Sequence, residues 1–84
     1  SGNCFGDYYT RGGLDTRRRE MITLCFLAAQ GGCEPQLTSH AAANMRVGND
    51  ERFLIAVVSQ CTPYIGYPRT LNALRCIADA AAKA

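Results

Sequence analysis

The sequence lacks closely spaced cysteine pairs, which argues against a disulfide framework and against structural zinc. Its cysteines are an odd set at irregular positions, without a CxxC pair or a signal peptide: Cys4, Cys25, Cys33, Cys61 and Cys76. This pattern predicts free thiols in a reducing, cytoplasmic compartment. A tetrahedral zinc site needs several Cys or His ligands at short spacing, and the chain has 1 histidine, so we expect no metal.

Charge and long hydrophobic runs are also scarce. The formal net charge of +2 is too small to indicate a nucleic-acid partner. The basic cluster at 17–19 is followed at once by Glu20, which favours a solvated or salt-bridged helix face over a phosphate-binding patch. The longest strongly apolar run, Met21 to Ala29, is about half as long as a membrane-spanning helix. We therefore expect neither nucleic acid nor membrane as a partner.

The chain is also short. Its 84 residues make a single domain, 1–84, and a domain of this size buries only roughly 60% of the surface that its unfolded chain exposes. Hydrophobic residues are 48% of the chain, more than a small monomer covers well. With disulfides and metal not expected, self-association remains, and we predict a homo-oligomer. The abrupt start suggests that the domain is truncated at its N-terminus or is half of a tandem protein.

No segment alternates polar and apolar residues for long enough to form a strand, so the predicted fold is all-α with about four main helices. The glycine-rich stretch 1–13 is predicted to be a loop, with Phe5 and Tyr8 packed on the domain or on a neighbour. Caps, prolines and glycines place helices at about 16–30 and 35–47, a third capped by Asn49 or Asp50, and a fourth opened by Pro68.

Three of these helices carry further expectations. The first is apolar nearly all round, which is typical of a helix buried on several sides. Pro63 and Gly66 are expected to disrupt the third helix, in a bend whose aromatic rings, including Tyr64, line a pocket. The fourth helix is expected to present one apolar face: Leu71, Leu74, Ile77 and Ala78.

The most suggestive side chains are Glu20, Cys33 and His40. Cys33 and His40 are two helical turns apart and share a face with Gln36. Cys33 precedes a helix N-terminus, where the dipole favours a thiolate, although it also fits as a small apolar filler.

The other two members also have alternative interpretations. Histidine gains and loses a proton near neutral pH, but His40 also fits a structural role beside small alanines. Glu20 either pairs with nearby arginines or is drawn into a buried setting, where desolvation favours its protonated form and proton transfer.

Three segments together resemble the carboxymuconolactone decarboxylase family, which lies in the alkylhydroperoxidase D-like superfamily. They are Arg19-Glu20 at the start of the apolar helix, GGCEPQLTSH at 31–40 and PYIGYPRTLNAL at 63–74. The resemblance runs from about Phe5 to Ile77. It implies an all-helical fold that assembles as a trimer or hexamer, with active sites in clefts near subunit contacts.

The family has two functional branches, which the residues separate in part. In the thiol-dependent branch, a Glu works with a CxxC and a following His, so Glu20, Cys33 and His40 match while Gln36 stands where the second Cys belongs. An amide cannot close a disulfide, so Cys25 or Cys61 would have to substitute. The other branch decarboxylates γ-carboxymuconolactone without metal or organic cofactor. For it, the resemblance implies that His40 supplies a proton and Glu20 orients or recharges it.

A dicarboxylate substrate also needs cationic partners. Arg18, Arg46 and Arg69 are candidates because a guanidinium binds a carboxylate in a bidentate manner, although surface salt bridges are the commoner fate of an arginine. Gln36 and Tyr64 complete the candidate substrate contacts. Three functions stay open: a lactone decarboxylase, an alkylhydroperoxidase-like thiol peroxidase using Cys33, and a non-catalytic oligomerising module.

Overall fold

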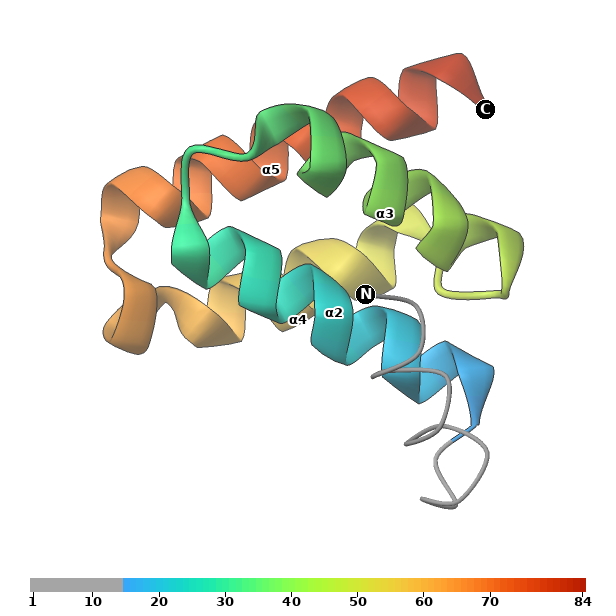
Figure 1. Ribbon diagram of the computed structural model, residues 1–84, viewed down its shortest axis with the longest axis horizontal. Coiled ribbons are helices and arrows are strands. Elements are labelled where there is room, and N and C mark those ends of the chain that lie inside the picture. Colours follow the sequence, from blue (N-terminus) through green and yellow to red (C-terminus); the bar gives the residue numbers. More distant parts are fainter. Residues whose placement is uncertain (1–14) are drawn as a thin grey trace.

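The computed structural model describes residues 15–84, so the loop expected at 1–13, with Cys4, Phe5 and Tyr8, lies outside the described part. The described residues form four helices and no strand, which confirms the all-helical prediction. The helices, shown in Figure 1, are α2 (Thr16–Gln30), α3 (Glu34–Arg46), α4 (Glu51–Ile65) and α5 (Tyr67–Lys83). None of them is both long and apolar enough to span a bilayer.

The helix boundaries follow local signals in the sequence. The carboxylates of Asp15 and Asp50 accept hydrogen bonds from the backbone N–H groups of Arg18 and Phe53, each at 2.9 Å, and so cap α2 and α4. Prolines lie in the first turns of α3 and α5, where no intrahelical N–H is needed. Gly31, with φ 72°, ends α2 in a conformation that disfavours a side chain.

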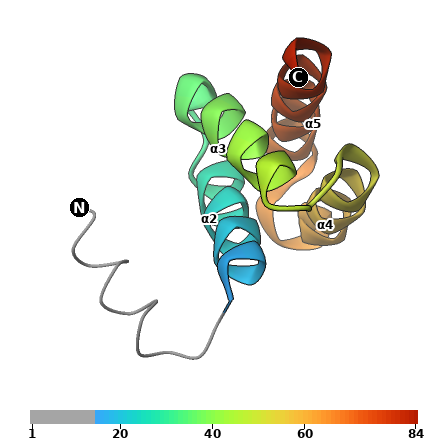
Figure 2. The same cartoon turned by 90° about the vertical axis from the view of Figure 1, so that its right-hand side faces the viewer.

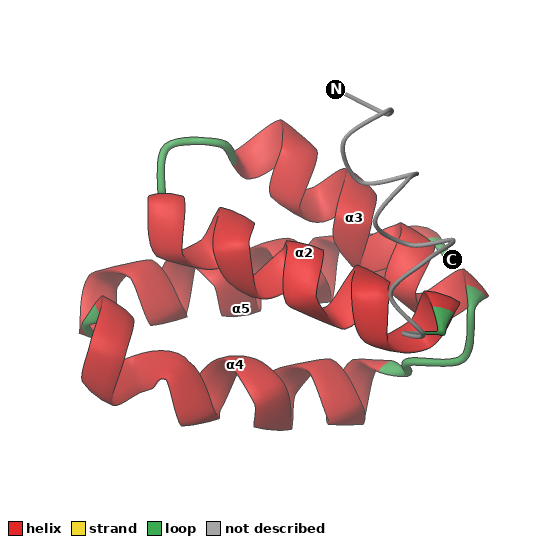
Figure 3. Cartoon of the chain, turned by 60° about the horizontal axis from the view of Figure 1, so that its bottom comes forward, coloured by secondary structure: helices red, strands yellow, loops and turns green. Residues whose placement is uncertain are grey.

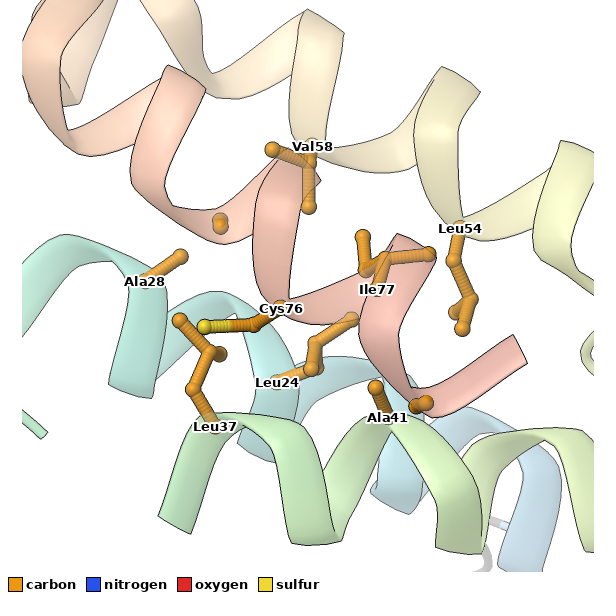
Figure 4. Close-up of a cluster of buried hydrophobic side chains, with 10 residues drawn as sticks. Leu24, Ala28, Leu37, Ala41, Leu54, Val58, Cys76 and Ile77 are labelled. Carbon is orange, nitrogen blue, oxygen red and sulfur yellow. The ribbon is translucent and has the colours of Figure 1, made fainter. Parts of the chain in front are cut away.

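The four helices enclose one core. α2 and α3 form an antiparallel pair, and α5 packs on both α3 and α4 (Figures 1 and 3). In Figure 2, α2 and α3 lie on one side and α4 and α5 on the other. Side chains from all four helices meet between them (Figure 4): Leu24, Ala28, Leu37, Ala41, Leu54, Val58, Ala73, Cys76, Ile77 and Ala80.

The expected break at Pro63 is not where α4 ends. The helix continues through Pro63 to Ile65 and stops at Gly66, whose φ is 88°. Proline removes one backbone hydrogen bond, and two residues from the helix end this loss falls in the last turn only. The aromatic rings of this segment point outward, because Tyr64 is 88% and Tyr67 is 66% exposed.

The buried face of α5 is also rotated from the expected one. Ile77 is buried as predicted and Leu74 is partly buried, but Leu71 is 43% exposed and Ala78 is exposed. The rest of the buried face consists of small residues, Thr70, Ala73, Cys76 and Ala80. Small side chains let α3 and α4 approach α5 closely, and this packing outweighs the larger Leu71.

Helix α2 is buried within the chain along a narrow strip. Leu24 and Ala28 are its buried residues, whereas Phe26, on another face, is 62% exposed. Helix α2 therefore has more apolar surface than the other helices of the same chain cover.

Candidate functional site

Glu20 and His40 meet across the α2–α3 interface. The Nδ1 atom of His40 lies 3.3 Å from Oε1 of Glu20. The His40 side chain is 40% exposed and that of Glu20 is 21% exposed, so the pair is partly shielded and still open to solvent. When Glu20 is ionised, Nδ1 donates a hydrogen bond to it, and Nε2 is the ring nitrogen that this contact leaves unengaged.

A buried asparagine holds the backbone on both sides of this pair. The Asn44 side chain is fully buried, and its Nδ2 donates to the carbonyl oxygens of Glu20 at 2.9 Å and of His40 at 2.8 Å. One amide group thus links α2 and α3 at the two residues that carry the acid and the imidazole. This fixes the separation of the two backbones at the point where the side chains meet.

Asn49 extends this network into the turn after α3. Its Nδ2 donates to the side-chain oxygen of Asn44 at 2.9 Å and to the carbonyl of Arg17 at 2.8 Å, and its backbone N–H donates to the Asn44 carbonyl at 2.9 Å. Asn49 is 3% exposed. Both polar atoms of the Asn44 side chain and the Nδ2 atom of Asn49 have hydrogen-bond partners, which compensates the burial of these groups.

Sequence reasoning missed both asparagines. Asn44 lies one turn after His40, directly after three alanines, and Asn49 lies near the Gly48 turn, where a polar residue passes for a cap. The available signal was the single polar residue in the apolar stripe Leu37–Ala41–Asn44. An amide at a core position usually has a specific partner.

Cys33 lies at the opposite end of the α2–α3 pair. It is the N-cap residue of α3, as expected, but its S–H donates to the carbonyl oxygen of Leu27 at 3.3 Å, which engages the sulfur as a thiol. Among the contacts of residues 15–84, none joins the Cys33 sulfur to Glu20 or His40. Two helical turns separate Cys33 from His40, a rise of about 10 Å. A shared helix face therefore does not bring sulfur and imidazole together.

The candidate arginines are spread over the domain. Arg18 lines a cavity of about 270 Å³ at the start of α2, together with Arg17, Met21 and Phe53, and neither Glu20 nor His40 lines it. Arg46, at the end of α3, lines a different cavity of about 430 Å³.

Within residues 15–84, no hydrogen bond or ion pair joins the remaining candidates to the Glu20–His40 pair, although Gln36 lies one helical turn before His40. Arg69, in the first turn of α5, extends along Gly31, where its Nε would lie 3.0 Å from an added Cβ. Gln36 is exposed in the first turn of α3, and Tyr64 is exposed near the end of α4. Within one chain, therefore, the acid–imidazole pair is assembled and the cationic candidates are not gathered round it.

The chemistry that this arrangement can perform is proton transfer. A carboxylate next to an imidazole fixes the ring orientation and stabilises the imidazolium, while the outer nitrogen accepts or delivers a proton. The described residues contain no cluster of three metal-ligating side chains.

Comparison with known proteins identifies the chain. The profile of the Carboxymuconolactone decarboxylase family matches residues 2–79, nearly the whole sequence. Comparisons with curated proteins and with solved structures gave no match. The four-helix fold, the segment order of the sequence and this match agree, and the chain belongs to the carboxymuconolactone decarboxylase family.

Proposed function

We propose that this protein decarboxylates a γ-carboxymuconolactone-like lactone acid without a cofactor, with His40 as proton donor and Glu20 as the residue that positions it. The observation that carries the proposal is the 3.3 Å contact between Nδ1 of His40 and Oε1 of Glu20. Family membership supports the substrate class. The half-exposed imidazole supports a reactant on the Nε2 side.

The reaction needs little from the protein beyond binding and one proton. The bond between the lactone ring and its carboxylate breaks, carbon dioxide leaves, and the electron pair delocalises into the unsaturated lactone. The imidazolium of His40 then gives its Nε2 proton to the carbanionic carbon of the lactone. The imidazole of His40 takes up a proton from water before the next cycle. Glu20 acts through His40, because its carboxylate orients the ring and stabilises the charged form.

The substrate carboxylates require cations near His40, and in an oligomer a neighbouring copy of the chain would provide them. Arg18, Arg46 and Arg69 remain the proposed anchors because their guanidinium groups suit bidentate carboxylate binding. Arg18 and Arg46 line cavities that neither Glu20 nor His40 lines, and Arg69 extends along Gly31. In a homotrimer or homohexamer, an arginine from a second copy would close the 40% exposed side of His40. Exclusion of water there would strengthen every charge interaction with the substrate.

The direct test is an assay of the purified chain with γ-carboxymuconolactone. Loss of the lactone's ultraviolet absorbance should accompany release of an equal amount of carbon dioxide. His40→Ala should lower kcat by about 10²–10⁴-fold, the usual contribution of general acid–base catalysis. Ser39→Ala, a change at the exposed neighbouring residue, is the matched control and should leave kcat unchanged.

The solution mass and fold of each variant are measured beside its activity. A folded, assembled wild-type protein without turnover would refute the decarboxylase proposal and favour the non-catalytic oligomerising module. Full turnover in a folded His40→Ala variant would remove His40 from the mechanism.

The thiol-dependent alternative makes a different demand. Peroxide reduction at Cys33 requires a second thiol, and Gln36 occupies the family position of that thiol. In the described structure the Cys33 S–H is hydrogen-bonded to the Leu27 carbonyl and lies two helical turns from His40. Peroxide consumption that depends on an added thiol, and that disappears in Cys33→Ser, would support this alternative over the decarboxylase.

A further inference from the structure

Two cysteines that are far apart in the sequence meet between α2 and α4. The Sγ atoms of Cys25 and Cys61 lie 3.9 Å apart, with the Cys61 S–H directed at Cys25. Both residues are half-buried. The Cys61 sulfur also lies 3.5 Å from the Val57 carbonyl oxygen of its own helix.

This is the one thiol pair among the described cysteines. The Cys33 S–H donates to the Leu27 carbonyl, and the buried Cys76 sulfur lies 3.8 Å from the Glu34 carbonyl. No third metal-ligating side chain joins Cys25 and Cys61 in residues 15–84, so the pair lacks the ligands of a metal site. The chemistry left to two adjoining thiols is oxidation to a disulfide.

The two sulfurs differ in reactivity. Burial, together with charge repulsion from Cys61 and the hydrogen bond between the two thiols, raises the pKa of the Cys25 thiol from 9.0 to about 12. Cys25 is therefore protonated and a poor nucleophile while Cys61 is a free thiol. The first attack on an oxidant falls to Cys61.

We propose that Cys25 and Cys61 form a reversible redox site that is oxidised by low-molecular-weight disulfides such as oxidised glutathione. In the first step, the Cys61 thiolate attacks one sulfur of the disulfide. A Cys61–glutathione bond forms, and one glutathione thiolate leaves and takes up the proton that Cys61 lost. In the second step, Cys25 loses its proton and attacks Sγ of Cys61, and the second glutathione leaves as a thiol. The two protein thiols are oxidised, and one small disulfide is reduced to two thiols.

The first step favours the second. Once Cys61 is in a mixed disulfide, it no longer ionises, so the charge repulsion that helps to raise the pKa of Cys25 disappears, while burial, the largest cause, remains. The sulfurs must also approach from 3.9 Å to about 2.05 Å, the S–S bond length. That approach of about 2 Å is short beside the arc that a cysteine sulfur sweeps on rotation about its Cα–Cβ bond.

The disulfide would link α2 to α4 covalently across the end of the core. Because it joins residues 25 and 61, it encloses all of α3 and restricts the unfolded chain strongly. The oxidised protein should therefore melt on the order of 10 °C higher than the reduced protein. This proposal does not depend on the decarboxylase activity, because it uses neither Glu20 nor His40.

The test is treatment of the folded, full-length chain with oxidised glutathione, followed by peptide mapping without reduction. We expect a cross-linked peptide that contains Cys25 and Cys61, a mass loss of about 2 Da per chain, and a higher Tm that dithiothreitol reverses. Cys33→Ser is the matched control and should form the same cross-link.

Single variants test the order of the steps, with alanine as a second replacement wherever serine disturbs folding. Cys25→Ser should retain glutathione on Cys61, and Cys61→Ser should leave Cys25 largely unmodified. Cross-links between other cysteines, a lower Tm after oxidation, or two free thiols at Cys25 and Cys61 after treatment would overturn the proposal. Glutathione held on Cys25 in Cys61→Ser would overturn the assigned order.

Discussion

Helix α2 contacts its two neighbours through opposite kinds of chemistry. Toward α3 it presents Glu20, in a contact where imidazole, carboxylate, amide and carbonyl groups are all hydrogen-bonded. Toward α4 it presents Cys25, whose sulfur touches that of Cys61 in half-buried surroundings. The first contact already has its hydrogen bonds, whereas the second can still form a covalent bond. The polar contact therefore suits repeated proton transfer, and the sulfur contact suits a change of state.

The largest effect is expected from substitutions that break the contact between Glu20 and His40. Glu20→Gln and His40→Gln should each lower kcat for lactone decarboxylation by about 10²–10⁴-fold. The double variant should be little worse than either, because the two residues act as a unit. Glu20→Gln should leave KM nearly unchanged, since in the proposed mechanism Glu20 acts through His40.

Steady-state kinetics on the four proteins form the double-mutant cycle. Additive losses, or a loss confined to KM in Glu20→Gln, would show that the contact does not operate as a proton-transfer pair.

The next largest effect is expected when the backbone support of the Glu20–His40 contact is removed. Asn44→Ala removes the side-chain hydrogen bonds to the carbonyls of Glu20 and His40 and one of the two made by the Asn49 amide, which keeps its bond to the Arg17 carbonyl. Since the loss of a hydrogen bond by a buried group costs about 1–3 kcal/mol, the free energy of unfolding should fall by about 3 kcal/mol. Denaturant unfolding measures the change, and kcat should fall as well in the fraction that stays folded.

The matched control for that experiment is Asn72→Ala, because Asn72 is only half-buried and lines a surface cavity. Equal losses of stability in the two variants would contradict the assignment of Asn44 to a specific network.

A smaller effect concerns the sulfur contact in the reduced protein. Folding raises the pKa of Cys25 from 9.0 to about 12, so between these values the unfolded chain releases a proton that the folded chain keeps. Stability is therefore full below about pH 9 and declines as the pH rises toward 12. Solvent screening of this half-buried thiol limits the effect to a few degrees of Tm.

The measurement is Tm against pH in the presence of a phosphine reductant. Cys25→Ala should flatten the alkaline decline, while Cys33→Ser should follow the wild type. Identical curves for all three proteins would mean that Cys25 does not contribute to the decline of Tm at alkaline pH.

The smallest effect is expected at Cys33, and it tests whether this residue acts separately from the Glu20–His40 pair. Cys33→Ser should leave lactone decarboxylation within about twofold of wild type, because the sulfur lies about 10 Å along α3 from His40. Measured kcat and KM provide the check. A hundredfold loss in a folded protein would make Cys33 part of the reaction and would support the thiol-dependent alternative.

Much of the fold was predictable because its signals are local. Asp15 and Asp50 cap helices, Gly31 ends one, and Pro35 opens another, each by a backbone effect that acts within one turn. The expectation failed at Pro63, because the effect of a proline depends on how much helix follows it. It also failed at Leu71, because the buried face of α5 is selected by how closely the neighbouring helices pack.

The candidate site was predictable only in part. Sequence reasoning selected Glu20, Cys33 and His40 together, and the contacts unite Glu20 with His40 while Cys33 lies at the other end of α3. Spacing along one helix specifies azimuth, but two turns of rise keep side chains apart. The role of Asn44 was not predicted, because its partners are backbone carbonyls. Every residue has a backbone carbonyl, so the sequence does not indicate which of them a side chain will contact.

The sequence by itself determined four helices, most of their ends and the family, because these depend on neighbours within a turn or on the order of segments along the chain. Tertiary structure decided which side chains meet. The pairing of Glu20 with His40, the amide that spans their backbones, and the contact of Cys25 with Cys61 each join two helices. Such contacts depend on the relative rotation and depth of packed helices, which the whole core sets at once.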